Sequence, residues 1–342
     1  MMEGLSPAAV GESLRRMLLI RRVEEQVIHF AGDRSDLLTG NYHVYIGQEA
    51  TGVAACRALA PTDFMFTTHR NHGHLIARGG DPGRVLAEII GRVDGYNRGR
   101  GGTFHVAAPE LGVLHTSAIV GGAVPLAAGA ALALKRRGGS RVSAVFFGDG
   151  SLEEGATYEG LALASLWKLP VLFVCEHNGA ATGSRGGGEA ATGSHPSRTL
   201  SDFPASLGIT SQVVDGVDLR AVYGAAAAAV AAVRRGDGPV FLEVRTTGWP
   251  GNRGGAAVLP GGDFNLGWAW NPAAAPPELR AWTAESDPVA RLANELVTSG
   301  AFSRADLEAV DREVSEQSAS AARFALASPL PAPERALQHV VA

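Results

Sequence analysis

The sequence predicts an α/β protein built on a doubly wound, mostly parallel sheet with helices on both faces. Two short apolar runs, residues 142–147 and 170–175, are rich in β-branched and aromatic residues and show no alternation. That pattern is typical of parallel strands buried on both faces. Residues 153–167 between them carry apolar side chains at helical spacing. Strand, turn, helix and strand in this order form one βαβ unit.

Polar and small residues follow both predicted strands. Asp149 lies in a Gly-Asp-Gly-Ser turn, and Asn178 follows the second strand. Because open parallel sheets bind ligands at the carboxyl ends of their strands, these two side-chain oxygens should meet at one edge. Oxygen ligands suit Mg²⁺, and glycines followed by a helix N-terminus suit a diphosphate. The alternative is an ordinary turn and a loop asparagine without a ligand.

The remaining elements extend this pattern in both directions. Helices are expected at 7–30, 47–58, 124–137, 203–207, 219–235, from Asp287 to 296 and at 303–326, and strands at 211–216 and 239–246. We expect one domain over 1–342, with helical extensions at 1–40 and 280–342. The stretches 180–198 and 248–277 are predicted to be irregular and to serve function or remain unordered.

Composition excludes several classes of protein. The 342 residues carry a net charge of −4, which gives no general attraction to nucleic acid or to acidic membranes. No run of apolar residues is long enough to span a membrane, and the N-terminus lacks a signal pattern, so a cytoplasmic location is expected. The two cysteines, Cys56 and Cys175, are expected to be buried free thiols.

A cluster of chemically capable side chains follows the apolar residues 64–66. His69, Arg70, His72 and His74 lie within six positions. Each histidine taken alone could be a structural hydrogen-bond partner, but their grouping beside an arginine makes a catalytic or binding role equally plausible. A metal site is less attractive here, because neither carboxylates nor thiolates accompany the imidazoles and Mg²⁺ does not favour them.

Two further segments have features of a ligand site. Residues 97–106 are rich in glycine and basic, and Arg98 and Arg100 could hold phosphate, although a solvated basic loop is an equal alternative. Ala118, Ile119 and Val120 precede the helix at 124–137 and would suit a backbone segment lying against a flat ring.

The chain resembles the α subunit of thiamine-diphosphate-dependent 2-oxo acid dehydrogenase E1 enzymes of the pyruvate, branched-chain and acetoin types. The motifs that carry the resemblance are Gly-Gln-Glu-Ala at 47–50, His-Gly-His at 72–74, Gly-Arg-Gly-Gly at 99–102, Ala-Ile-Val-Gly at 118–121, Gly-Asp-Gly at 148–150 and Trp-Lys-Leu-Pro at 167–170. The resemblance implies the thiamine-diphosphate-binding fold, thiamine diphosphate and Mg²⁺ as cofactors, and an α2β2 heterotetramer. A separate β chain would supply the glutamate that activates the cofactor.

The resemblance also implies roles for individual residues. Asp149, the Asn178 side chain and the main-chain carbonyl of Ala180 would hold Mg²⁺. The other cofactor-binding residues would be Gly150, Ser151, His69, Arg70, Ala118, Ile119, Val120 and Asn252. His43 falls where pyruvate enzymes have a substrate-contacting histidine, and His43, His69 and His72 are the candidate acid–base residues.

Several positions depart from the family pattern. Ala180 replaces an aromatic residue, His69 replaces a tyrosine, and His177 replaces an asparagine. After residue 246 the family carries an arginine that binds diphosphate and a histidine that assists acyl transfer to a lipoyl arm. By register, Gly248 and Asn252 stand at those positions, and Arg253 is a candidate replacement for the lost charge.

These departures leave three functions open. The first is an E1 α subunit that decarboxylates a 2-oxo acid and passes the acyl unit to a lipoyl domain. The second is a transketolase-like transfer of a two-carbon unit from a ketose phosphate to a lipoyl or acyl-carrier protein in a biosynthetic pathway. The third is a non-catalytic scaffold subunit, which the intact Asp149 and Asn178 argue against.

Overall fold

The computed structural model describes residues 5–33, 36–38, 41–179, 199–252, 256–335 and 338. Its centre is a six-stranded sheet with the order β2-β1-β3-β4-β6-β5, and every neighbouring pair is parallel. The strands are β1 (Phe64–Thr68), β2 (Val113–Ser117), β3 (Ser143–Gly148), β4 (Val171–His177), β5 (Thr210–Asp215) and β6 (Val240–Arg245). The predicted α/β class with a parallel sheet is therefore confirmed.

Helices cover both faces of the sheet, as the doubly wound pattern requires. Alternate residues of β3 enter different cores: Ala144 and Phe146 pack in one cluster, and Val145 and Phe147 pack in the other. The first cluster includes α2 (Glu49–Ala58) and α8 (Leu219–Arg235). The second includes α5 (Ala123–Arg137) and α6 (Gly155–Leu166). This two-sided burial explains why the strand sequences show no polar alternation.

The central βαβ unit differs from expectation at one point. A 3₁₀ helix, Asp149–Glu153, lies between β3 and α6, and α6 begins only at Gly155. Asp149 therefore belongs to the 3₁₀ turn, several residues before the α6 N-terminus. The predicted contact of this turn with an anion must come from the backbone of the 3₁₀ turn itself, because the α6 dipole acts only near its first turn.

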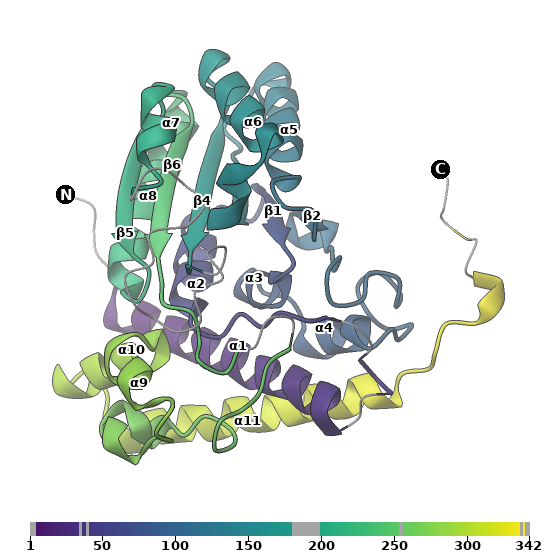
Figure 1. The fold of residues 1–342 in the computed structure, drawn as a ribbon, viewed down its shortest axis with the longest axis vertical. Helices are drawn as coiled ribbons and strands as arrows, with labels where there is room; N and C mark the ends of the chain where they lie inside the picture. The colour runs from purple at the N-terminus through teal and green to yellow at the C-terminus, as the bar shows by residue number, and fades with distance from the viewer. Residues whose placement is uncertain are drawn as a thin grey trace.

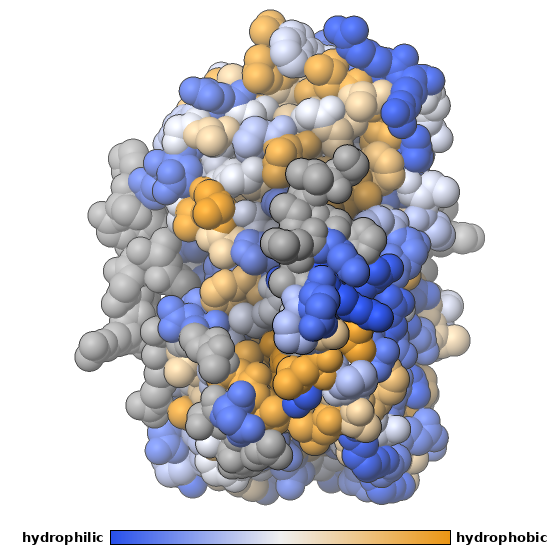
Figure 2. All heavy atoms as spheres, turned by 90° about the vertical axis from the view of Figure 1, so that its right-hand side faces the viewer, coloured by the Kyte–Doolittle hydropathy of each residue, from blue (hydrophilic) through white to orange (hydrophobic). Residues whose placement is uncertain are grey.

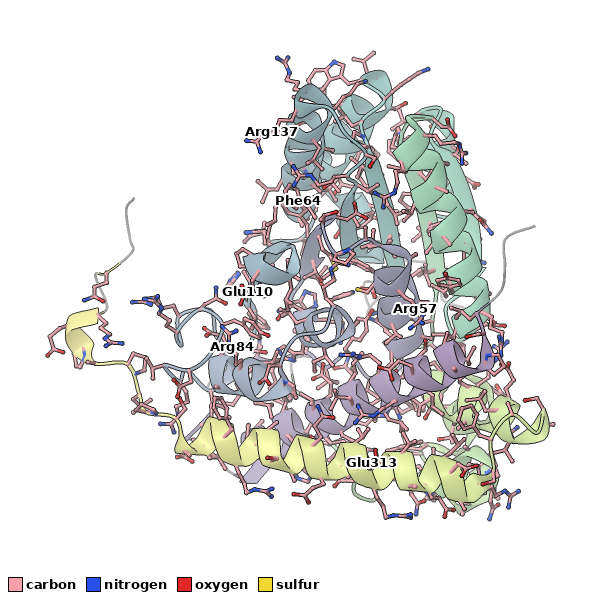
Figure 3. All side chains as sticks on the ribbon, turned by 180° about the vertical axis from the view of Figure 1, so that it is seen from behind. Arg57, Phe64, Arg84, Glu110, Arg137 and Glu313 are labelled. Carbon is pink, nitrogen blue, oxygen red and sulfur yellow. The ribbon has the colours of Figure 1, made fainter. Side chains whose placement is uncertain are left out.

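Long helices frame the carboxyl ends of the strands. Figure 1 shows the arrowheads of β4 and β6 pointing toward α1 (Pro7–Asp33), with α11 (Arg304–Ala327) running beside α1. Figure 3, from behind, shows α11 below α1 and α4 (Pro82–Ile89), and the chain after α11 leaves the body of the molecule. Residues of α1, the sheet, α10 (Pro288–Thr298) and α11 share one buried cluster. The single-domain organisation stays a prediction that this shared cluster supports.

Some elements do not follow from the sequence pattern. The strands β1 and β2 and the short helices α3 (Asn71–Ala77) and α4 are new findings. So is the packing of the irregular stretch after β6, in which Trp249, Phe264 and Trp268 are buried. The helices α7 (Asp202–Ser206) and α9 (Arg280–Glu285) complete the α-helices of the described residues. Among those residues, no helix combines the length and apolar character that membrane crossing requires.

Candidate active site

Asp149 and Asn178 lie at the carboxyl ends of two neighbouring strands. Gly148 of β3 pairs with Glu176 of β4, so the residues that follow each strand emerge side by side. Asp149 is only 4% exposed, whereas Asn178 is partly exposed. Among described residues, nothing comes within 4 Å of a Cβ built on Gly148 or Gly179, so the backbone here faces open space.

The donor set at this edge fits Mg²⁺. A carboxylate and a side-chain amide supply hard oxygen ligands without imidazole or thiolate. In the described part of the chain, no group of three or more His, Cys, Asp and Glu residues is placed to hold a metal ion. Ala180, the predicted third ligand, lies outside the described residues. The roles of Asp149 and Asn178 remain predictions that this geometry supports.

The predicted ring-binding segment packs directly on the turn after β3. The Ser151 hydroxyl oxygen accepts a hydrogen bond from the Gly121 N–H at 3.3 Å. Gly121 has a φ of +74°, and a Cβ there would lie 2.8 Å from Glu154 and Thr157 atoms, so only glycine allows this approach. Ile119 and Val120 are 71% and 51% exposed. Two large apolar side chains thus stand in solvent beside Ser151.

Arg70 lies behind the same edge, at the N-cap of α3. Its guanidinium donates to the carbonyl oxygen of Val44. Burial lowers the pKa of Arg70, while the nearby carboxylates of Glu176, Glu24 and Asp149 act in the opposite direction. Arg70 is a partly exposed cation near three acids, and an added anion must compete with these acids for its charge, as a multiply charged diphosphate can.

His43 and His69 form a ring cluster with Phe104. The two imidazole centroids are 4.6 Å apart, and the Phe104 centroid lies 5.9 Å from His43 and 6.3 Å from His69. Burial, followed by the charge of Arg70, lowers the pKa of His43 to about 4 and that of His69 to about 3. Both imidazoles are therefore neutral at pH 7, and each ring keeps one N–H donor and one acceptor nitrogen.

His72 is in a different situation, because it is fully buried and both ring nitrogens have partners. Nδ1 lies 3.1 Å from Glu24 Oε2, and Nε2 lies 2.8 Å from the Thr103 hydroxyl and 3.0 Å from the Thr103 carbonyl oxygen. Glu24 Oε1 also accepts from the Tyr45 N–H at 3.0 Å. The geometry suits His72 to hold the surrounding segments rather than to exchange protons with a substrate.

A second buried carboxylate, Glu176, organises the neighbouring side chains. Its Oε1 accepts from the Tyr45 hydroxyl and lies 3.3 Å from His74 Nε2. The other ring nitrogen of His74 lies 2.6 Å from the Thr67 hydroxyl. His74 thus has two partners inside the protein, as a structural histidine would.

The segment after β6 reaches the same edge. A Cβ on Gly248 would lie 3.5 Å from the Asn178 carbonyl oxygen. Asn252 bridges to Ala257 in antiparallel fashion, and its Oδ1 is buried without a hydrogen-bond donor among the described residues. The Tyr42 hydroxyl donates to the Ala257 carbonyl at 2.8 Å and accepts from the Ala257 N–H at 3.1 Å. These two hydrogen bonds join the loop that contains Asn252 to Tyr42, the residue before His43. Arg253 lies outside the described residues.

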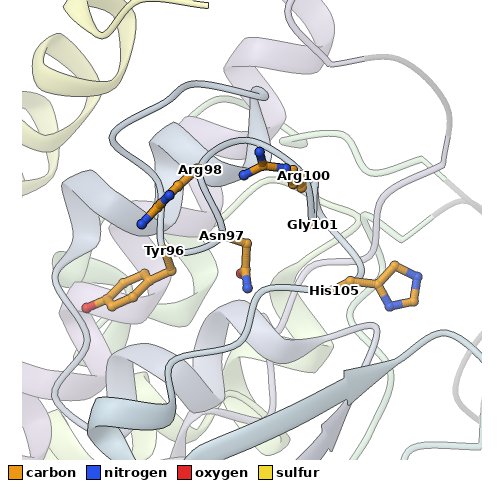
Figure 4. Close-up of a pocket in the computed structure, with 6 residues that line it drawn as sticks. All are labelled: Tyr96, Asn97, Arg98, Arg100, Gly101 and His105. Carbon is orange, nitrogen blue, oxygen red and sulfur yellow. The ribbon is translucent and has the colours of Figure 1, made fainter. Parts of the chain in front are cut away.

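A basic hollow of about 410 Å³ adjoins the histidine cluster on the outer side of one loop. It is lined by Tyr96, Asn97, Arg98, Arg100, Gly101 and His105 (Figure 4), with His105 at the end opposite Tyr96. The buried carboxylate of Glu88 shapes the loop by accepting hydrogen bonds from the N–H groups of residues 97, 99 and 101, at 2.7, 2.9 and 2.6 Å. His105, which lines the hollow, directly follows Phe104 of the histidine cluster in the chain.

Comparison with known proteins decides the family. The sequence model described as dehydrogenase E1 component matches residues 15–247. The chain belongs to the dehydrogenase E1 component family. It is 38% identical over 331 residues to the pyruvate dehydrogenase E1 component subunit alpha of Zymomonas mobilis, covering 96% of this chain and 88% of the relative.

Two acetoin:2,6-dichlorophenolindophenol oxidoreductase α subunits are also similar to this E1 chain. The one from Cupriavidus necator is 36% identical over 95% of this chain and 92% of its own length. The one from Bacillus subtilis is 40% identical over 68% of each chain. The resemblance inferred from the motifs is confirmed, and the chain is an α-type subunit of a thiamine-diphosphate-dependent E1 enzyme. Membership of a catalytic family disfavours the scaffold alternative.

The E1 fold brings most of the predicted site residues to one place, but four important partners are not evident from the sequence. Glu24 reads as one charge among many on an amphipathic helix, and Phe104 as a loop residue. Glu176 offers a signal, since a carboxylate at the end of a fully apolar strand calls for buried partners. Gln48 lies within a recognised motif, but its contact with Asn178 spans 130 positions and is visible only in three dimensions.

Proposed function

We propose that this E1 chain and a β chain together cleave a small 2-oxo acid and pass the acyl unit to a lipoyl domain, with thiamine diphosphate and Mg²⁺ as cofactors. The single observation that carries the proposal is the pairing of β3 with β4, which places Asp149 and Asn178 at one edge. When bound, thiamine diphosphate supplies a nucleophilic carbon and an electron sink.

We assign the cofactor-binding roles to residues of this chain by their positions. Asp149, the Asn178 oxygen and the Ala180 carbonyl would hold Mg²⁺. Gly150 and Ser151 would face the diphosphate with backbone N–H groups, and Arg70 would pair with its charge. Ala118, Ile119 and Val120 would lie against the cofactor ring.

His43 and His69 are the proposed catalytic histidines. Their lowered pKa values keep both imidazoles neutral at pH 7, so each ring can donate its N–H as a hydrogen bond to the substrate oxygen as that oxygen gains negative charge. His69 would also contact the cofactor. His72, with both nitrogens engaged, would act by holding Glu24 and Thr103 in place. Asn252 would contribute its buried Oδ1 where the family carries a histidine.

A β chain is the proposed partner because exposed apolar side chains lie beside the site and along the α5–α6 face. They are Ile119 and Val120 beside Ser151, and Leu126, Leu163, Leu166 and Trp167 on or next to α5 and α6. Figure 2 shows hydrophobic groups on the upper part of the face that carries α5 and α6. Such patches mark interaction sites. We propose an α2β2 heterotetramer, located in the cytoplasm, with the cofactor between the α and β chains.

One observation favours the second candidate, transketolase-like transfer from a ketose phosphate to a lipoyl or acyl-carrier protein. The hollow beside the histidine cluster contains Arg98 and Arg100, and arginine is well suited to phosphate. The absence of the family's arginine and histidine at Gly248 and Asn252 favours an acceptor other than a lipoyl arm, because lipoyl acylation uses that histidine in the resembling enzymes.

The test combines the full chain with its β chain, thiamine diphosphate and Mg²⁺. Pyruvate, branched 2-oxo acids and ketose phosphates are supplied in turn, and reduction of 2,6-dichlorophenolindophenol or formation of acyl-lipoamide is followed. We expect turnover of at least one 2-oxo acid. Turnover of a ketose phosphate with none of the 2-oxo acids would replace the first function by the second.

A further inference from the structure

Gln48 lies at the start of α2, where its backbone is held on both sides. Its N–H donates to the Tyr45 carbonyl at 3.1 Å, and its own carbonyl accepts from the Gly52 N–H at 3.2 Å. The preceding Gly47 has a φ of +93°, and a Cβ there would come within 3.2 Å of the Trp282 ring. Only glycine permits this turn, which sets the direction in which the Gln48 side chain leaves the backbone.

A buried ion network fixes the same turn to two other helices. Glu49 accepts from the Gly47 N–H at 2.9 Å and from Arg21 Nε at 2.6 Å. The Arg21 guanidinium also pairs with Asp287, the N-cap of α10, at 2.9 and 3.1 Å. Burial by itself would lower the pKa of Arg21, but Asp287 and Glu49 raise it above its usual range. Gln48 therefore projects from a rigid frame made by α1, α2 and α10.

The Gln48 side chain meets Asn178. Gln48 is 4% exposed, and its Oε1 accepts a hydrogen bond from Asn178 Nδ2 at 2.6 Å. The oxygen and nitrogen of an amide lie on opposite branches, so this pairing turns Asn178 Oδ1 away from Gln48. The reverse pairing would direct the Asn178 nitrogen, a donor, toward any cation. The orientation seen here is the one that a metal ligand requires.

The side-chain nitrogen of Gln48, Nε2, is buried and has no acceptor among the described residues. Buried donors in proteins are nearly always hydrogen-bonded, so an unmatched one beside a predicted metal ligand calls for an oxygen from elsewhere. Diphosphate oxygens and the water molecules on a hydrated cation are acceptors of that kind.

We propose that Gln48 is a positioning residue of the cofactor site with two functions. Its Oε1 holds the Asn178 amide with the oxygen directed to the cation, and its Nε2 donates to an oxygen that arrives with the cation and the diphosphate. The inference rests on the proposed magnesium site at Asp149 and Asn178, and it adds a residue whose side chain holds a ligand of that site.

The test measures binding by calorimetry, on the full chain purified with its β chain. Mg²⁺ is titrated at fixed thiamine diphosphate, and thiamine diphosphate at fixed Mg²⁺. Gln48→Met removes acceptor and donor at similar length, and Gln48→Asn keeps the amide but is too short to reach Asn178. Gln48→Glu keeps an acceptor for Asn178 but lacks the donor. Thr51→Val, one turn along α2 and fully buried, is the matched control.

We expect Gln48→Met and Gln48→Asn to weaken Mg²⁺ binding at least tenfold, with Gln48→Glu within threefold of the parent chain. Gln48→Glu should still weaken thiamine diphosphate binding, and Thr51→Val should change neither. Equal Mg²⁺ affinities in the parent, Met and Asn variants would overturn the proposal, as would a Glu variant as weak for Mg²⁺ as the Met variant. Far-ultraviolet circular dichroism confirms folding, and the Asn variant decides if the Met variant does not fold.

Asp149→Ala in the same assay separates this inference from the site on which it rests. Loss of Mg²⁺ binding in Asp149→Ala with full binding in Gln48→Met rejects only the role of Gln48. Full binding in Asp149→Ala rejects the magnesium site itself.

Discussion

Glu24 Oε2 lies 3.1 Å from His72 Nδ1, and neither side chain has any exposed surface. The same carboxylate receives the Tyr45 N–H through its other oxygen. Glu24 thus joins α1 to α3 and to the segment that carries His43. A buried carboxylate with two donors fixes the position of His72 and of the backbone next to His43.

Replacement of Glu24 should therefore cost stability. We expect Glu24→Ala to reduce the free energy of unfolding by about 2 kcal/mol, because buried hydrogen bonds to a charged group are lost and His72 and Tyr45 N–H lose their acceptor. Urea unfolding followed by circular dichroism measures the change. Glu12→Ala, on the exposed side of the same helix with a 3.7 Å contact to Arg16, is the control and should stay within about 0.5 kcal/mol. Equal effects of the two substitutions would refute the role of Glu24.

Asp149→Ala should abolish cation-dependent binding of thiamine diphosphate. The carboxylate supplies the only full negative charge among the proposed Mg²⁺ ligands, and no other side chain of the set can replace it. Calorimetry with and without Mg²⁺ measures the loss. Glu153→Ala removes an exposed carboxylate from the same 3₁₀ turn and should bind normally. Unchanged affinity in Asp149→Ala would show that the metal lies elsewhere.

The lowered pKa values of His43 and His69 predict a pH dependence of stability. Between pH 6.5 and about 4, the unfolded chain binds protons on these histidines while the folded chain does not. Their contribution is therefore fully present above pH 6.5 and is lost as the pH falls through that window. Unfolding in urea at pH 7 and pH 5 should show that the double substitution His43→Gln and His69→Gln loses less stability on acidification than the parent chain. A parallel loss in both would contradict the assigned shifts.

Asn252→His restores the residue that the resembling enzymes use for acyl transfer. We expect the rate of acyl transfer to lipoamide to rise at least roughly tenfold, because one positioned acid–base group typically contributes that much or more. Reduction of 2,6-dichlorophenolindophenol, which does not require lipoamide, should change little, and Asn252→Ala serves as the size control. No change in acylation would mean that this loop does not take part in the transfer.

The basic hollow predicts how phosphorylated donors behave. If a ketose phosphate is turned over, Arg98→Ala should raise its KM about tenfold and leave the KM for pyruvate unchanged, since a charge-assisted contact to phosphate is lost. Arg57→Ala, at the end of α2, is the control (Figure 3). An equal rise for both donors would assign Arg98 to the loop structure rather than to phosphate.

Local patterns in the sequence predicted the centre of the fold well. The strands β3 and β4 and the helix α8 are marked by continuous apolar runs and by alanine-rich helical spacing, which depend on neighbours in the chain. The edge strand β2 is short and contains His115 and Thr116, so it carries no such signal. The irregular stretch after β6 is packed through aromatic residues with partners far away in the sequence: Arg21 of α1 lies over Phe264, and Arg304 of α11 lies over Trp270.

The residues of the candidate site also fall into those that the sequence revealed and those that it did not. Asp149 and Asn178 follow directly from strand ends, and the family resemblance added Arg70 and the histidines. The buried carboxylates Glu24 and Glu88 could not be recognised, because their partners lie in segments that helical periodicity does not relate to them. Their role as buried hydrogen-bond acceptors arises only from tertiary packing, which a sequence pattern does not show.

The hydrogen bonds between the Tyr42 hydroxyl and the Ala257 backbone have a consequence for substrate range. They hold the loop through main-chain atoms that no substitution at residues 248 or 252 removes. These two of the positions at which this chain departs from the resembling enzymes can thus exchange side chains on a constant scaffold. Donor and acceptor preference can then change through a few side chains, while the sheet, the proposed diphosphate edge and the proposed surface for a β chain remain as they are.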